Sequence, residues 1–132
     1  MTIATRPVRA RRASVPKHGP RVLVVDDSGF ARAHLRQLLG RAGARIAAEA
    51  STANEALQLF LTVRPDVVTM DMNMPGLNGL DAILALRDLD PRCRVILITA
   101  VREDPIVAGL AAMGVPVLHK PVDEAQLARL IR

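Results

Sequence analysis

Three short stretches of this 132-residue chain are apolar at almost every position and end at charged residues. RVLVV runs into Asp26 and Asp27, DVVTM runs into Asp71, and VPVLH runs into Lys120. A strand of about 4 to 8 residues that is apolar throughout, instead of at alternating positions, is typical of a parallel sheet buried on both faces. Ligands of such sheets bind beyond the carboxyl ends of the strands, so we expect these four charges to converge at one edge.

Strand-like and helix-like stretches alternate five times after residue 20. The expected strands are residues 21–25, 44–50, 66–70, 95–99 and 115–118. The expected helices start after residue 28, at residue 52, at residue 80, within 103–113 and at residue 123. This alternation predicts an α/β domain with a doubly wound, five-stranded parallel sheet and helices on both faces.

Capping residues and glycines indicate where the first two helices begin and end. Ser28 is a typical N-cap, and Gly40 and Gly43 are expected to close the helix that follows it. Thr52 and Glu55 form a capping-box pattern at the start of the second helix. The Arg-Pro pair before the third strand is expected to stop that helix, because the residue before a proline disfavours helical geometry.

The basic residues are concentrated at the amino end of the chain. The net charge is +5, yet residues 22–132 hold 12 Lys+Arg against 13 Asp+Glu, and residues 1–21 contain no acid. The basic residues of that first segment are Arg6, Arg9, Arg11, Arg12, Lys17 and Arg21. Prolines and the lack of apolar periodicity predict a basic disordered arm over residues 1–20 and a folded domain over residues 21–132.

The arm has a functional and a neutral interpretation. Clustered arginines attract phosphates, so the arm could bind nucleic acid, an anionic membrane surface or an acidic protein. It could equally be a solvated extension, since the arm has no aromatic residue that would stack on bases.

The single cysteine, Cys93, cannot form an internal disulfide, which is consistent with a reducing compartment, and we expect its thiol to be buried. No stretch reaches the roughly 18 apolar residues that span a bilayer, and the amino end lacks the apolar segment of a signal peptide. The sequence therefore predicts a cytoplasmic protein without membrane insertion.

Three clustered carboxylates need more positive charge than one lysine supplies. Two unit charges about 4 Å apart interact by roughly 4 kcal/mol at an effective dielectric of about 20. Carboxylate oxygens are hard ligands, and the apolar stretches that end at these acids contain neither His nor Cys, so Mg²⁺ is favoured over Zn²⁺. A turn that reads Asp26-Asp27-Ser28 would repel a bound phosphate, which argues against a dinucleotide site or a P-loop.

A metal ion bound by these acids would remove this repulsion of phosphate, because a dication can also bind a phosphoryl oxygen. Asp71 then becomes a possible nucleophile, since carboxylates form acyl phosphates in covalent catalysis. Thr99 and Lys120, both at the ends of predicted strands, are candidate donors to the phosphoryl oxygens.

Four motifs follow one another along residues 21–132, namely VLVVDDSGFARAHLRQLL, VVTMDMNMPGLNGLDAI, ILITA and VLHKP. In this order they resemble the receiver domains of two-component response regulators, and within them the stand-alone chemotaxis type known as CheY. The resemblance implies a flavodoxin-like sheet with the strand order 2-1-3-4-5. It also implies phosphorelay signalling, with a sensor histidine kinase or phosphotransfer protein as donor and a downstream target protein as second partner.

The resemblance implies a role for each of the three clustered aspartates. Asp71 would be the phospho-acceptor, and it would share a Mg²⁺ ion with the chain's other ligands. Asp27 would bind the metal directly and Asp26 through a water molecule. The main-chain carbonyl of Asn73 would complete the protein's share of the coordination.

The resemblance implies that residues at the ends of the fourth and fifth strands respond to phosphorylation. Thr99 would bond the phosphoryl group, Lys120 would pair with it, and the bond to Pro121 would be cis. This chain has Val117 where receivers commonly have Tyr or Phe. The usual coupling between the threonine and an aromatic ring therefore cannot operate. We expect altered signalling at the surface formed by the last two helices and the strand between them. His119 is expected to face solvent.

Two other functions stay open. Metal-dependent phosphatases with an aspartyl nucleophile resemble Asp-x-Asp, whereas this chain has Asp71-Met72-Asn73 and lacks the second acid that protonates a leaving group. The other possibility is a receiver scaffold that acts through its basic arm. The leading interpretation is therefore a phospho-accepting signalling domain with no enzymatic turnover beyond its own phosphorylation and slow dephosphorylation.

Overall fold

Two of the three apolar stretches, RVLVV and DVVTM, form strands at the centre of the sheet, whereas the third, VPVLH, contributes an edge strand. The computed structural model describes residues 19–74 and 79–132. Its strands are β1 (Arg21–Val25), β2 (Arg45–Ala50), β3 (Val67–Asp71), β4 (Arg94–Thr99) and β5 (Val117–His119). They pair in parallel in the order β2-β1-β3-β4-β5, which confirms the predicted topology. The Ala-rich β2 and the short β5 form the edges, where burial on both faces is not required.

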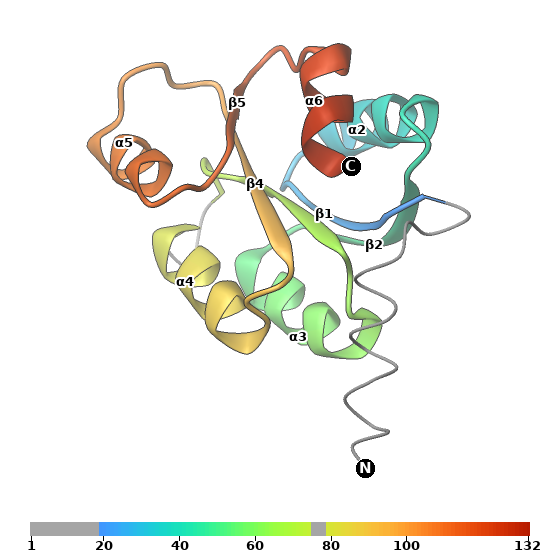
Figure 1. The fold of residues 1–132 in the computed structure, drawn as a ribbon, viewed down its shortest axis with the longest axis horizontal. Coiled ribbons are helices and arrows are strands. Elements are labelled where there is room, and N and C mark those ends of the chain that lie inside the picture. Colours follow the sequence, from blue (N-terminus) through green and yellow to red (C-terminus); the bar gives the residue numbers. More distant parts are fainter. Residues whose placement is uncertain (1–18, 75–78) are drawn as a thin grey trace.

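Helices cover both faces of the sheet (Figure 1). They are α2 (Gly29–Arg41), α3 (Ala53–Val63), α4 (Gly79–Leu89), α5 (Pro105–Ala112) and α6 (Glu124–Ile131). Buried residues of α3, α4 and α5 pack on one face, around Phe60, Met70 and Leu86. Those of α2 and α6 pack on the other face, around Leu39, Ile96 and Leu127. The two cores hold the strands rigidly, so that the loops beyond their carboxyl ends have a fixed base.

Four of the five strands differ from the prediction at one or both ends, and the differences in β3 and β5 have a structural cause. Asp71 is the last residue of β3 and does not follow the strand, because its segment continues to pair with β4 as far as Ile98. The fifth strand starts at Val117, whereas residue 115 was expected. The amide of Val115 instead donates to Leu110 in the turn that ends α5, and Pro116 has no N–H for the ladder.

Most helix ends lie where the capping residues predict them, with one correction. Ser28 caps α2 through the amide of Ala31, but the helix continues through Gly40, so that residue does not close it. The chain turns at Gly43, which adopts a φ of 90°. Thr52 caps α3 by accepting from the amide of Glu55.

Arg94, the first residue of β4, holds the carboxyl end of α6. The guanidinium of Arg94 donates to the main-chain oxygens of Leu130, Ile131 and Arg132. A helix of eight residues is marginal by itself. A cation at its last carbonyls, together with the burial of Leu127, therefore stabilises α6 in place.

Gly19, the first described residue, packs closely against the turn before β2. Gly19 has a φ of 81°, and a Cβ there would lie 1.7 Å from the carbonyl oxygen of Gly43, so no other residue fits without a shift. The carbonyl of Pro20 accepts from the amide of Arg45 at 2.8 Å. The predicted arm falls mostly on residues 1–18, outside the described residues, and its boundary at residue 20 stays a prediction.

Two smaller expectations concern the rest of the fold. Cys93 is buried, as expected for a structural thiol. Within residues 19–74 and 79–132, none of the helices combines the length and the apolar character needed to cross a bilayer.

Candidate metal centre

The carboxyl ends of β1 and β3 bring three carboxylates together. Asp26 and Asp27 follow β1, and Asp71 ends the neighbouring strand β3. Each offers an oxygen that lies within 4.8 Å of the oxygens of the other two. Asp26 and Asp71 are buried, whereas Asp27 is exposed to solvent. The cluster is thus an acidic site with one open side.

Lys120 places its ammonium group beside the two buried acids. Its Nζ lies 3.2 Å from Asp26 Oδ2 and 3.8 Å from Asp71 Oδ1. The amide of Lys120 donates to the carbonyl of Thr99 at 2.8 Å, which fixes the turn after β5. The bond between Lys120 and Pro121 is cis, as the family resemblance implied. In this state the lysine therefore pairs more closely with Asp26 than with Asp71.

Every polar group of Asp26 has a partner. Its amide donates to the carbonyl of Ala50 at 3.0 Å, and its Oδ1 accepts from the amide of Ser28 at 2.9 Å. Its Oδ2 accepts from Lys120, and its main-chain carbonyl accepts from Arg32 Nη1 at 2.6 Å. The position of this residue is fixed from four directions.

Asp71 lies in a setting that disfavours its charge. Burial raises the pKa of Asp71 above its ordinary value, and the negative charges of Asp26 and Asp27 raise it further. The hydrogen bond from the Asn73 amide to Asp71 Oδ1, 3.1 Å long, and the positive charge of Lys120 act in the opposite direction. A further positive charge at the cluster would favour the ionised and nucleophilic form.

Thr99 and Asn73 lie close to this cluster along the chain and the sheet. Thr99 is buried at the end of β4, one position beyond Ile98, the register partner of Asp71. Its hydroxyl oxygen accepts from the amide of Val101 at 3.0 Å, which leaves the hydroxyl hydrogen available. Asn73 is exposed two residues after Asp71 and touches it through its amide.

The donor set fits a hard divalent cation. Three carboxylates and one ammonium leave an excess of two negative charges, which one dication would balance. Among residues 19–74 and 79–132, the metal-ligand atoms that converge here are all carboxylate oxygens. Mg²⁺ and Ca²⁺ prefer such ligands, whereas Zn²⁺ prefers nitrogen and sulfur. Asp26, Asp27 and Asp71 are the residues that could hold the ion.

The sequence prediction missed a network behind the cluster. Arg32 and Arg36, one turn apart on α2, both bind the carboxylate of Glu49 on β2, at 3.2 and 2.7 Å. Glu49 is the only acid in the Ala-rich strand RIAAEA, and α2 contains no acid at all. The single acid of β2 and the arginines of the acid-free α2, on two consecutive elements, were the available signal for this contact.

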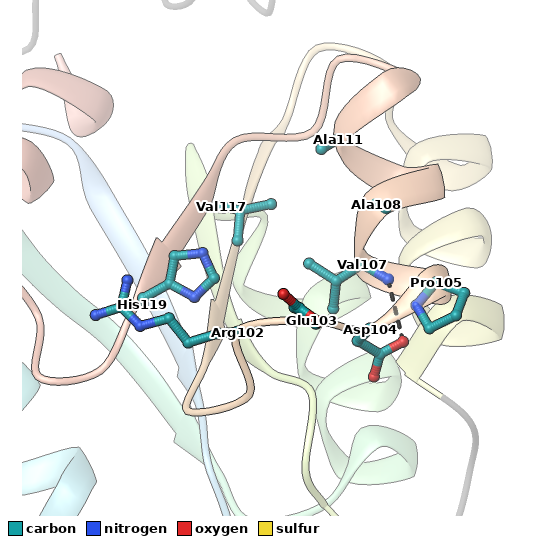
Figure 2. Close-up of a pocket in the computed structure, with 9 residues that line it drawn as sticks. All are labelled: Arg102, Glu103, Asp104, Pro105, Val107, Ala108, Ala111, Val117 and His119. Atoms are coloured by element: carbon teal, nitrogen blue, oxygen red, sulfur yellow. Dashed lines mark hydrogen bonds between the residues drawn. The ribbon is translucent and has the colours of Figure 1, made fainter.

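A groove lies between α5 and β5 (Figure 2). Its volume is about 640 Å³, and small side chains form much of its wall, including Ala108, Ala111 and Val117. His119 also lines the groove, which is open to solvent, and its side chain is half-buried, so the expectation that it faces solvent holds only in part. Its Nδ1 is buried and has no hydrogen-bond partner within the described residues. The valine leaves space where receivers commonly carry an aromatic ring.

Comparisons with known proteins agree with this fold and site. Residues 22–132 match the family described as response regulator receiver domain. The chain is 39% identical over 89 residues to the chemotaxis protein CheY of Thermotoga maritima, covering 67% of this chain and 74% of that protein. It is 38% identical over 112 residues to protein CcdB of Bacillus subtilis, covering 84% and 93%.

A solved structure shows the same architecture. The CheX-CheY-BeF3-Mg²⁺ complex from Borrelia burgdorferi contains a chain that matches with a TM-score of 0.79 and 26% identity, covering 91% of this chain and 94% of that one. The chain has a five-stranded sheet in the order 2-1-3-4-5 and an acidic cluster at the carboxyl ends of β1 and β3. Its sequence also matches the receiver domain family over residues 22–132. This chain belongs to the response regulator receiver domains, the signalling domains of two-component phosphorelays.

Proposed function

We propose that this domain accepts a phosphoryl group on Asp71, from a sensor histidine kinase or a phosphotransfer protein, with Mg²⁺ held by the acidic cluster. The observation that carries the proposal is the position of the Asp71 carboxylate. It is buried at the end of β3, within 4.8 Å of two further carboxylates, and 3.8 Å from the Lys120 ammonium. A structural carboxylate would not need this excess of negative charge around it.

The transfer exchanges one bond to phosphorus for another. A carboxylate oxygen of Asp71 forms a bond to phosphorus while the bond from phosphorus to the donor nitrogen breaks. The electron pair of that bond leaves with the nitrogen, which takes up a proton. When bound, Mg²⁺ supplies positive charge to the oxygens of the transferred group.

The chain's own residues complete the site. Lys120 would move its ammonium from Asp26 toward the phosphoryl oxygens, a short distance because both acids already lie within 3.8 Å of Nζ. The Thr99 hydroxyl would donate to the same group while it keeps the bond that it accepts from Val101. The carbonyl of Asn73 is proposed as the remaining protein ligand of the metal.

Incubation with acetyl phosphate and Mg²⁺ tests the proposal. Intact mass spectrometry should show one added phosphoryl unit, stable to acid and labile to base, as expected for an acyl phosphate. Peptide mapping should place it on Asp71, and chelation of the metal with EDTA should prevent it. A protein that takes up no phosphoryl group, or that takes it up on His119, would contradict the assignment.

The domain should not turn over phosphate esters. Asn73 stands where an aspartyl phosphatase would carry its second acid, and an amide cannot protonate a leaving group. We therefore propose phosphorylation followed by slow self-hydrolysis only. Steady turnover of a small ester such as p-nitrophenyl phosphate would favour the phosphatase instead.

The signal is proposed to pass from Thr99 to His119 and the groove beside it. Phosphorylation adds a charge of roughly −1.5 to −2, which shifts a two-state equilibrium of loops and helices. Thr99 and His119 are register partners on β4 and β5. Because Val117 has no ring, the imidazole two residues further along is the aromatic group of β5 that lines the groove. A downstream target protein would then bind the altered groove.

The His119 ring should report the phosphorylated state in NMR spectra. Addition of beryllium fluoride and Mg²⁺, which imitate the phosphoryl group, should shift the ring resonances of His119. His34, which is exposed on α2, serves as an internal reference and should not shift. Replacement of Thr99 by alanine should remove the His119 response, and an unchanged response in that variant would refute the route.

Two further parts of the proposal rest on sequence alone. The basic arm, which lies mostly outside the described residues, could add binding to nucleic acid or an anionic surface. The location in the cytoplasm is proposed from the single cysteine and from the kinase that the domain needs as donor.

A further inference from the structure

We infer that Arg32 is a positioning residue for the metal site, acting through the main-chain carbonyl of Asp26 to set the affinity of the cluster for Mg²⁺. The inference rests on the proposed function, because it concerns the ion that the phosphoryl transfer requires. Arg32 would not bind the ion itself. Its role would be to fix the peptide unit between the two consecutive aspartates.

The guanidinium of Arg32 connects the loop after β1 with β2. Its Nη1 donates to the carbonyl oxygen of Asp26 at 2.6 Å, and its Nε donates to Glu49 Oε1 at 3.2 Å. The side chains of Arg32 and Glu49 are only 23% and 26% exposed, so water screens this pair less than a surface ion pair. Arg32 itself follows the N-cap Ser28 by one helical turn, and its amide donates to the Ser28 carbonyl.

Glu49 holds the arginine in place. It lies on β2 beside Val24 of β1, so the sheet fixes its backbone. Arg36 donates to the second carboxylate oxygen of Glu49 at 2.7 Å. The carboxylate is therefore held by two arginines, and the planar guanidinium of Arg32 keeps one orientation toward the loop.

The contact matters most for Asp27. A peptide unit is planar, so fixing the carbonyl oxygen of Asp26 also fixes the amide and the Cα of Asp27, the atom that carries its side chain. The carboxylate of Asp26 has partners of its own in Ser28 and Lys120. The carboxylate of exposed Asp27 has no hydrogen bond or ion pair within residues 19–74 and 79–132. Its position among the three acids therefore depends on its backbone.

Removal of Arg32 should weaken the binding of Mg²⁺. Groups that orient metal ligands typically contribute about 10-fold to 100-fold to metal affinity. We expect the dissociation constant of Arg32→Ala for Mg²⁺ to rise by about 10-fold, at the lower end of that range because one ligand of three is affected. The measurement is a titration of the metal-free protein with MgCl₂, followed by amide NMR shifts of the loop after β1.

Arg36→Ala is the matched control. Arg36 lies on the same face of α2 and binds the same glutamate, but no contact joins it to Asp26 among the described interactions. Both alanine variants lose one ion pair to Glu49, and Arg32→Ala also loses the hydrogen bond to the Asp26 carbonyl, so the thermal unfolding temperature without metal should fall in both variants and further in Arg32→Ala. The Mg²⁺ dissociation constant should change only for Arg32→Ala. Arg32→Lys should recover part of the affinity, because one ammonium can reach the carbonyl or Glu49 but does not bridge both as a fork.

The Mg²⁺ titrations test the inference about Arg32 and the proposed function separately. Wild-type affinity in Arg32→Ala would overturn the inference and leave the proposed function standing. Equal losses of Mg²⁺ affinity in the Arg32 and Arg36 variants would also overturn it, because the network would then act through general stability. A wild-type protein with no saturable Mg²⁺ response would instead remove the proposed function, and the inference with it.

Discussion

Replacement of Asp71 by asparagine is expected to abolish phosphoryl uptake from acetyl phosphate and Mg²⁺. The amide has nearly the same size, so the variant keeps the buried place at the end of β3 and an oxygen for the Asn73 amide. It lacks the carboxylate that forms an acyl phosphate. Intact mass spectrometry should show no adduct under conditions that label the wild-type protein completely.

Asp66→Asn is the matched control for this result. Asp66 precedes β3 at its other end, and its carboxylate accepts from the amide of Arg21 at 2.9 Å. Its loss removes a charge next to the same strand without touching the acidic cluster, so labelling should be retained. Labelling of Asp71→Asn at the wild-type rate would show that the acceptor lies elsewhere.

The same Asp71→Asn variant should be more stable than the wild-type protein in metal-free buffer at neutral pH. Because burial raises the pKa of Asp71, the folded state binds a proton more tightly than the unfolded chain, whose aspartates titrate near pH 3.9. The contribution of Asp71 to stability therefore falls as the pH rises from about 3.9 through the raised pKa of the folded state. Asparagine does not titrate and avoids this loss.

Urea unfolding at a series of pH values measures this difference. The advantage of the variant should be largest at neutral pH and should vanish below about pH 4, where Asp71 is protonated in both states. Saturating Mg²⁺ should stabilise the wild-type protein more than the variant, because the ion binds the folded cluster. A wild-type protein that is the more stable of the two at neutral pH without metal would contradict the prediction.

Replacement of Lys120 by alanine should destabilise the metal-free protein by about 1 to 3 kcal/mol. The change leaves the carboxylate of Asp26, only 1% exposed, without the ammonium that lies 3.2 Å away. Loss of one partner of a fully buried pair costs more, but Lys120 is 30% exposed, so solvent screening reduces the effect. Urea unfolding without metal provides the measurement, and added Mg²⁺ should recover part of the loss.

The lysine variant should also separate phosphorylation from the response. Asp71 keeps its nucleophilic oxygen, so labelling by acetyl phosphate should continue, whereas the His119 ring should no longer shift. Lys120→Arg, which retains the positive charge, should behave more like the wild-type protein. An unfolding free energy equal to that of the wild-type protein would show that the pair with Asp26 is not a stabilising one.

The sheet and the acidic cluster were accessible from the sequence because both follow from simple periodicity. Parallel strands expose their carboxyl ends at one edge, so charges that end apolar runs must lie near one another. That argument places Asp26, Asp27 and Asp71 without knowledge of the helices. It gives no information about which acid the lysine would approach, and the structure shows the shorter distance to Asp26.

The contacts that hold the site were not accessible in the same way. The bond from Arg32 to the carbonyl of Asp26 depends on how α2 lies over β2, and no periodicity encodes that placement. The same holds for Arg94, whose partners belong to a helix that comes much later in the chain. His119 was predicted to face solvent because β5 is an edge strand, whereas its ring is half-buried and lines an open groove together with residues of α5.

The close seat of Gly19 on Gly43 has a practical consequence for experiments on this protein. It fixes the point at which residues 1–18 join the domain, just before β1 and on the amino side of the sheet. The five residues of β1 separate that point from the aspartates by about 16 Å. An affinity tag or a sensor-chip linker that joins the chain directly before Gly19 would therefore start about 16 Å from the acidic cluster.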